Sequence, residues 1–344
     1  MPGFITHYIA GKSTQKSISQ DIRDYITPIN PLFNLGTQGP DIFFYYISGF
    51  ITRRIKNVGT QMHNGDLGRF FMGIADILKQ SKSQSERKLV FAYTAGFLVH
   101  YAVDVHTHPY VYAQTYDPPT PKIKETTRHR HFETSIDVLM LRRFYDRRPS
   151  DYKLWKLISP EKLHMRAAAA ATSDAIRQVY NRDINPCDVY HAMEQMAHFT
   201  RHMQSKNGRR KRLLQGIENI TAGSHVFSAL IHPQEVTDNR DYLNTKNTPW
   251  SPPWAPDKTR TESFVDLFES AVHDAAQMIQ ALYSYMNNSL SHEQLAAQIR
   301  NCSLKTGVCD SAPKANWLAP RNHEKCNQSK LTCNNKLTYP GETP

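Results

Sequence analysis

The hydrophobic positions of this chain recur mainly at the spacing of an α-helix. The clearest segment covers residues 85–107, where Leu89, Ala95 and Val103 fall on helical positions and Pro109 follows as a stop signal. Further helices are expected at residues 127–144, 160–180, 187–204, 261–287 and 291–302. No segment alternates in the manner of a half-buried strand. The pattern therefore predicts an all-α, multi-helix bundle.

Two long irregular stretches interrupt this pattern, at residues 110–124 and 231–258, and both are rich in proline. Long loops of this kind often form lids or site walls, so His232, Trp250 and Trp254 in the second stretch are expected to lie over a cleft. Beyond residue 306 the periodicity is lost. We therefore expect a helical domain over residues 1–303, followed by an irregular, cysteine-containing tail over residues 304–344.

The charge of the chain narrows the choice of partners. Its 42 Lys and Arg residues exceed its 31 Asp and Glu residues, so polyanions such as phospholipid surfaces and nucleic acids are favoured over basic partners. A basic run at residues 209–212 is typical of a solvated loop, which could also dock an anionic membrane or a nucleic acid. The sequence gives no indication of the oligomeric state.

Residues 1–12 lack a basic start, a long apolar core and a cleavage site, so we expect a cytoplasmic protein, with peripheral membrane binding as an extension. The apolar stretch at residues 42–51 is about half the roughly 20 residues that span a bilayer, and no transmembrane helix is predicted. Four cysteines near the C-terminus form two pairs seven residues apart: Cys302, Cys309, Cys326 and Cys333. This spacing favours disulfides or free thiols over a zinc ribbon.

The first candidate metal ligands are His100, Asp104 and His108, which follow one another at intervals of four residues. On an α-helix this spacing aligns three side chains along one stripe. The flanking residues are apolar nearly all round, so the stripe is expected to be buried. A bound divalent cation compensates for that burial and prefers imidazole together with carboxylate. We therefore predict a metal site, with a hydrogen-bonded structural network as the alternative.

A second stripe, His129, Glu133 and Asp137, lies on the next predicted helix. Antiparallel packing of the two helices would bring the stripes face to face, and facing ligands on neighbouring helices are how helical bundles build multinuclear metal sites. Taken alone, this stripe is equally consistent with an exposed polar face.

Three isolated candidates are weaker: His7, Asp41 and His63. A lone histidine such as His7 beside Tyr8 is more often a core or surface residue than a ligand. Asp41 follows Gly-Pro and could simply cap the apolar helix after it.

Together these motifs resemble the zinc-dependent phospholipase C family, whose bacterial members share a helical bundle with a three-zinc cleft. The most specific part is the segment at residues 98–109, supported by His129 and Glu133 at the family's spacing. The segments around His7 and Asp41 also fit. The resemblance covers residues 2–137 well and residues 144–301 only loosely. It implies a bundle of the phospholipase C and nuclease type that holds two or three Zn²⁺ ions.

The resemblance also implies a ligand set: His63, His100 and Asp104 for one zinc, His108, His129 and Glu133 for a second, and His7 and Asp41 for a third. The family's third zinc also uses the amine and carbonyl of an N-terminal tryptophan, where this sequence has Met1 and Pro2. His106 is an alternative to His108, which is preferred because it keeps the helical stripe. Asp41 is expected to act as the general base or to orient the water.

The activity that this resemblance implies is hydrolysis of phosphodiesters by metal-activated water, with phospholipids as the expected substrate. An aromatic run at residues 43–46 could line the cleft, although such a run is more often core. One alternative is a single-strand nuclease of the related fold, whose hallmark Asp-x-Gly-Gly-Asn is missing after the metal helix. The other is a non-catalytic, metal-stabilised binding protein at membranes.

Overall fold

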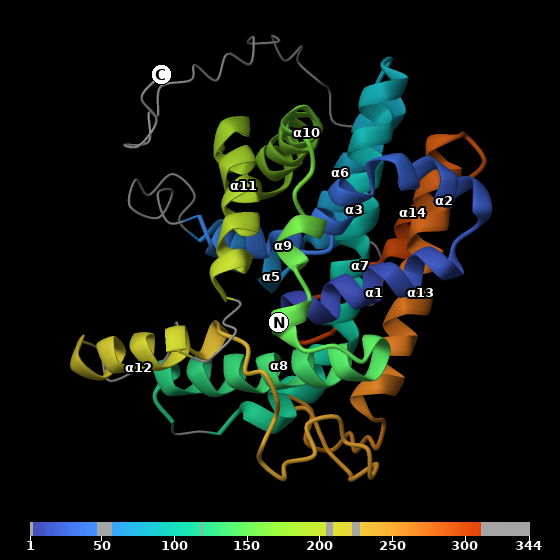
Figure 1. The fold of residues 1–344 in the computed structure, drawn as a ribbon. Helices are drawn as coiled ribbons and strands as arrows, with labels where there is room; N and C mark the ends of the chain where they lie inside the picture. The colour runs from blue at the N-terminus through green and yellow to red at the C-terminus, as the bar shows by residue number, and fades with distance from the viewer. Residues whose placement is uncertain (1–2, 47–56, 118–119, 204–208, 222–227, 311–344) are drawn as a thin grey trace, which may run out of the picture.

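The computed structural model describes residues 3–46, 57–117, 120–203, 209–221 and 228–310, and it is a bundle of helices (Figure 1). The α-helices are α1 (Phe4–Ser17), α2 (Gln20–Ile26), α3 (Asn30–Gly36), α5 (Val58–Asn64), α6 (Leu67–Gln80), α7 (Gln84–Thr115), α8 (Lys122–Tyr145), α9 (Leu154–Leu157), α10 (Lys162–Tyr180), α11 (Pro186–Met203), α12 (Arg209–Thr221), α13 (Phe264–Met286) and α14 (His292–Ile299). Short 3-10 helices are η1 (Thr27–Ile29), η2 (Gly39–Phe44), η3 (Pro149–Asp151) and η4 (Ser228–Leu230). The predicted all-α class is confirmed, since none of the described residues forms a strand.

Helix α7 is the central element of the bundle, and it packs most extensively against α13 and α3. Its N-terminus is capped by Ser83, whose side chain accepts a hydrogen bond from the backbone N–H of Glu86. By length and composition alone α7 would be able to cross a membrane, but 89% of its most apolar window is buried within the protein. The helix is therefore the core around which the others pack.

The prediction that Pro109 ends this helix is wrong, because α7 continues through it to Thr115. Proline removes one backbone N–H and leaves the carbonyl of Val105 without its helical partner. Tertiary packing outweighs this cost: Tyr110 and Val111 are fully buried, and the Tyr110 ring lies 5.3 Å from that of Trp250. The irregular stretch expected at residues 110–124 is correspondingly shorter, since α8 begins at Lys122.

The second expected irregular stretch is present, because no helix lies between η4 and α13. A single bridge joins Trp250 to Arg260, and the Trp250 indole donates a hydrogen bond to the carbonyl of Glu262. Helix α13 then begins at a capping box, in which Ser263 and Asp266 satisfy each other's backbone N–H groups. The stretch is thus ordered by its own hydrogen bonds.

Two glycines let α3 and α7 approach closely. A Cβ atom on Gly96 would lie 2.0 Å from the carbonyl oxygen of Phe33, and one on Gly36 would lie 2.2 Å from that of Tyr93. Real Cβ atoms do not make contacts this short, so any side chain here would push the helices apart. This close packing sets where the segment after α3 meets α7.

We expect Gly96→Ala to lower the free energy of unfolding by about 1–3 kcal/mol, because overpacking outweighs the usual gain from replacing a helical glycine. Gly216→Ala is the matched control, since nothing lies within 4 Å of the added Cβ and the substitution should raise stability by about 0.5–1 kcal/mol. Chemical denaturation of both variants measures the difference. Equal effects would show that the close approach is not tight.

Candidate metal centre

The stripe on α7 lies in the interior of the protein, where His100 and Asp104 are 0% exposed and His108 is 2% exposed. The Asp104 carboxylate lies between the two imidazoles. Its Oδ2 atom is 3.2 Å from His100 Nε2, and its Oδ1 atom is 3.7 Å from His108 Nε2. The four-residue spacing has therefore aligned three donor groups along the buried side of one helix.

Helix α8 supplies the second stripe. His129 Nε2 lies 2.8 Å from Glu133 Oε1, and the same oxygen is 3.8 Å from His108 Nε2. Nearer the end of α7, Thr115 Oγ1 is 3.2 Å from His129 Nδ1. Thr115 on α7 contacts His129 on α8, whereas His108, which comes earlier on α7, contacts Glu133, which comes later on α8. The two helices therefore run antiparallel, and this arrangement brings the stripes face to face.

The three isolated candidates come to the same place from three further elements. His7 on α1 reaches Asp104 Oδ1 at 3.3 Å, and its ring stacks on that of His100. Asp41 on η2 and His63 on α5 lie 3.2 Å apart, and His63 is 4.0 Å from Asp104 Oδ2. The structure thus brings together the eight residues of the expected ligand set.

Several donor atoms in this cluster are buried and make no hydrogen bond within the described residues. They are His7 Nε2, Asp41 Oδ1, His63 Nε2, His100 Nε2, both oxygens of Asp104 and His108 Nε2. Buried polar atoms are normally bonded, and leaving so many unpaired in one place would be costly. Nitrogen and carboxylate oxygen are the donors that zinc accepts. The cluster fits two or three zinc ions.

The donor atoms fall into three groups, within each of which they lie less than 4.8 Å apart: His7, His100 and Asp104; Asp41, His63 and His100; and His108, His129 and Glu133. The last group is the one expected for a single zinc. The first two differ from the expected sets, because His7 and Asp41 each join His100 and do not form a site of their own. Met1 and Pro2, at the place of the family's N-terminal ligand, lie outside the described residues.

His106, the alternative to His108, points elsewhere. Its Nε2 atom lies 3.1 Å from Asp274 on α13, and it belongs to none of the donor groups. This geometry favours His108.

Burial sets the protonation state of several of these histidines. It lowers the pKa of His108 to about 3 and holds the pKa of His129 well below its ordinary value. The pKa of His7 is also lowered, first by burial and then by the neighbouring His100. These imidazoles are therefore neutral at pH 7, which is the form that binds a metal ion.

Backbone carbonyls orient the rings. Thr37 O lies 3.2 Å from His100 Nδ1, and Gly59 O lies 2.7 Å from His63 Nδ1. In a neutral imidazole, a donor bond at Nδ1 selects the tautomer whose Nε2 lone pair faces the cluster. Gly39 has φ +51, and a Cβ atom there would lie 2.4 Å from the His100 ring, so only glycine fits beside this histidine.

Asp137, the last member of the α8 stripe, belongs to none of the donor groups and holds the start of α1 in place. Its buried carboxylate accepts hydrogen bonds from the backbone N–H groups of Ile5 and Thr6, from the Thr6 hydroxyl at 2.6 Å, and from His232 at 2.7 Å. A carboxylate at a helix N-terminus is also favoured by the helix dipole. Asp137 therefore fixes the helix that carries His7. Nothing in the sequence pointed to this pairing, because the partners are more than 130 residues apart.

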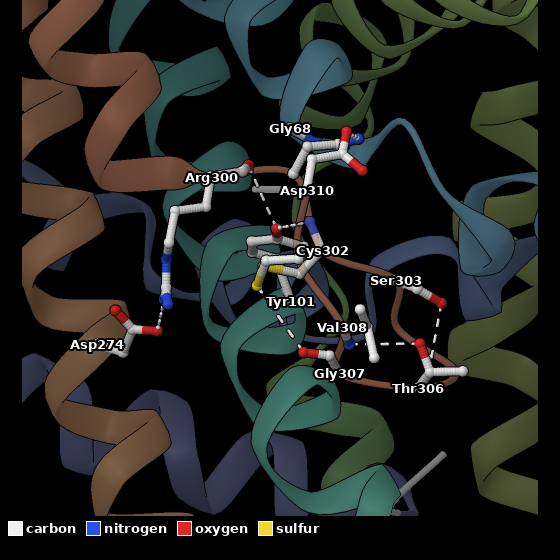
Figure 2. The surroundings of a disulfide bond; sticks show 12 residues. Gly68, Tyr101, Asp274, Arg300, Cys302, Ser303, Thr306, Gly307, Val308 and Asp310 are labelled. Carbon is white, nitrogen blue, oxygen red and sulfur yellow. Dashed lines mark hydrogen bonds and ion pairs between the residues drawn. A yellow bond between two sulfur atoms is a disulfide. The ribbon is translucent and has the colours of Figure 1, made fainter. Parts of the chain in front are cut away.

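A disulfide between Cys302 and Cys309 closes a small loop beside α7 (Figure 2). The backbone N–H of Cys302 donates to the hydroxyl of Tyr101, which anchors the loop to α7. The carbonyl of Leu304 accepts a hydrogen bond from His108 Nδ1, and the N–H of Lys305 donates to the carbonyl of His63. One loop thus contacts two of the candidate ligands.

This loop bears on two predictions. The preference for disulfides over a metal site is confirmed for the first cysteine pair, whereas Cys326 and Cys333 lie outside the described residues. The boundary at residue 303 stays a prediction. Even so, Leu304 is fully buried, and the backbone N–H of Lys305 donates a hydrogen bond to the carbonyl of His63 on α5.

A cleft of about 580 Å³ opens beside the cluster. It is lined by five of the candidate ligands: Asp41, His63, His108, His129 and Glu133. The aromatic rings of Phe44, Tyr45 and Tyr112 line its walls, whereas Phe43 is buried in the core. Of the expected lid residues, His232 lines the cleft. The Trp250 ring packs on Tyr110 instead.

The family model described as zinc dependent phospholipase C matches residues 3–184, which is more than half of the chain and includes all of the candidate ligands. No curated protein and no solved structure matches this chain.

Because Asp137 fixes α1, we expect Asp137→Asn to weaken the metal-binding group that contains His7. The outer partners of metal ligands typically contribute 10–100-fold to metal affinity, so a loss of about tenfold is expected for the most weakly held ion. Zinc titration against a competing chelator measures it. Asp146→Asn, an exposed change on the same helical segment, serves as the control and should leave the affinity unchanged. Equal affinities in both variants would rule out this role.

Reducing the disulfide should also weaken zinc binding, because the loop would no longer hold Leu304 O against His108. We expect a faster release of zinc to a chelator when a phosphine reductant is present, with a change of about tenfold. Cys302→Ser combined with Cys309→Ser should release zinc at the fast rate with or without reductant. If this double variant holds zinc as tightly as the oxidised protein, the loop does not support the site.

Proposed function

Because the chain belongs to the zinc-dependent phospholipase C family, we propose that it hydrolyses the phosphodiester bond of phospholipids. The observation that carries this proposal is the convergence of unbonded histidine nitrogens and carboxylate oxygens at the floor of an open cleft. A structural metal site would be closed, whereas a catalytic site must be reached by substrate and water.

Zinc bound by such a cluster would polarise a phosphoryl oxygen and bring a water close to a neutral pKa. The protein's own contribution is to hold the donors in place before substrate arrives. Asp104 at the centre of α7 and Glu133 on α8 supply negative charge to the cluster, and His129 and His108 supply neutral nitrogens. Phosphate ester hydrolysis needs no covalent intermediate with the protein in this arrangement.

Asp41 is the residue we assign to the water. Its Oδ1 atom is buried and unbonded within the described part of the chain, it lies 3.2 Å from His63 Nε2, and the side chain lines the cleft. A carboxylate in this position can accept a proton from an attacking water or orient it. Asp41 would also be able to hold zinc, since it shares a donor group with His63 and His100.

The cleft walls support a lipid substrate. Phe44, Tyr45 and Tyr112 offer apolar surface beside the donor cluster, and Arg130 and Lys305 lie on the lining as positive charges. A volume of about 580 Å³ falls within the usual range for small-molecule sites, which suits a headgroup with the adjoining glycerol. A phospholipid presents both the anionic phosphate and the apolar chains that these walls can contact.

In place of the cytoplasmic location predicted from the sequence, we propose an oxidising compartment. The Cys302–Cys309 disulfide bears on it, since disulfides are typical of oxidising compartments and uncommon in the cytosol. We infer that the chain works where thiols are oxidised, and fractionation of the producing cells with thiol labelling tests this.

The zinc-loaded protein should release a phosphorylated headgroup from phosphatidylcholine and should leave single-stranded DNA intact. Removing the metal with a chelator should abolish the activity, and adding zinc should restore it. In Asp41→Asn we expect kcat to fall by about 10²–10⁴, the range of general acid–base contributions. Elemental analysis of each variant separates lost catalysis from lost metal.

Other outcomes of the same assays identify the alternatives. Cleavage of DNA and not of lipid would favour the single-strand nuclease. Tightly held zinc with no hydrolysis of either substrate would favour a binding protein that uses the metal for stability. Either result would overturn the phospholipase proposal.

A further inference from the structure

A second cavity, of about 460 Å³, lies between α8, α12 and the segment after η4, away from the metal centre. Its lining includes four cationic side chains and a histidine: Lys124, Arg128, Lys211, Arg240 and His131. No carboxylate is among its lining residues in the described part of the chain. Of these four cations only Arg128 is paired with a carboxylate in the described part of the chain, and an anionic ligand would relieve the repulsion among the others.

Lys211 lines this cavity from α12. It lies in the first turn of α12, where a solvated loop was predicted at residues 209–212, so that prediction is wrong. Lys211 is partly buried on this helix, whereas its neighbours Arg210 and Arg212 are exposed. Burial lowers the pKa of Lys211 because no charged partner among the described residues offsets it.

The two arginines are already oriented by the protein. Arg128 donates to Asp117 at 2.9 Å and to the Thr120 hydroxyl at 3.1 Å. Arg240 donates to the carbonyl of Gln114 at 2.7 Å, and its guanidinium stacks over the Phe132 ring. A guanidinium held in this way loses little side-chain conformational entropy when its remaining N–H groups bind an oxyanion.

Each of the nearby carboxylates already has an ion-pair or hydrogen-bond partner within the protein. Asp117 pairs with Arg128, and Asp238 accepts a hydrogen bond from the Tyr242 hydroxyl at 2.8 Å. Glu218 on α12 accepts from the backbone N–H of Ser228 at 3.2 Å. These acids hold the walls of the cavity together and do not line it.

The cavity lies on the opposite side of α8 from the metal ligands. With about 100° between successive helical residues, Lys124, Arg128 and His131 share one face, and His129 and Glu133 project roughly 140–180° away from it. The same helix therefore separates two sites, and a ligand in the second cavity would not contact the metal cluster.

We propose that this cavity binds a phosphate-bearing anion. The ligand class follows from the donors: arginine forks and an ammonium group make charge-assisted hydrogen bonds with phosphate oxygens. The volume exceeds that of a bare phosphate, so the ligand carries a further group, either as a free phosphate ester or as the headgroup of an anionic lipid. The proposal goes beyond the hydrolysis proposed above and does not depend on it.

The test is to measure binding of inorganic phosphate to the zinc-loaded protein by calorimetry, together with co-sedimentation on vesicles. The vesicles are phosphatidylcholine alone or an equimolar mixture with phosphatidylglycerol, with brief contact on ice to limit hydrolysis. In Lys211→Met we expect phosphate or vesicle affinity to fall about tenfold or more, the effect of losing a hydrogen bond to a charged group. Lys211→Arg should retain most of the binding.

Arg212→Met is the matched control, because it removes the same charge from an exposed position on the same helix. It should change phosphate affinity little. Loss of phosphate binding in Lys211→Met alone supports a free phosphate ester, and loss confined to vesicles with phosphatidylglycerol supports a lipid headgroup. Equal losses in Lys211→Met and Arg212→Met, or no loss in either assay, would overturn the proposal, whatever the result of the hydrolysis assays.

Discussion

The burial of Asp104 at the middle of the central helix is the constraint around which the rest of this molecule is arranged. A carboxylate with no exposed surface and no hydrogen bond of its own within the described residues needs positive charge close by. Four histidine side chains approach it from α1, α5 and two turns of α7. A cluster of divalent ions is the arrangement that satisfies all of these groups together.

Positioning that cluster takes more of the chain than its ligands. Asp137 anchors the start of α1, two glycines let α3 lie directly on α7, and the disulfide loop brings Leu304 against His108. These contacts connect segments from both ends of the described chain. The geometry of the metal site therefore depends on contacts throughout the bundle. Substitutions far from the ligands should weaken zinc binding.

Much of the architecture could be predicted because it depends on local patterns. Helical periodicity marked the main helices, and the four-residue spacing of His100, Asp104 and His108 placed them on one stripe. Where local rules failed, tertiary packing was the cause. Pro109 does not end α7, because Tyr110 and Val111 are held in the core.

The sequence by itself determined the helical class, the two ligand stripes and the residue types that suit zinc, since these follow from side-chain chemistry and spacing along a helix. Only the tertiary structure decided how the ligands group around His100 and that Asp137 holds α1. It also decided that cationic side chains line a cavity on the side of α8 opposite the metal ligands. Those relations join residues that are distant along the chain, and local spacing carries no information about which of them will meet.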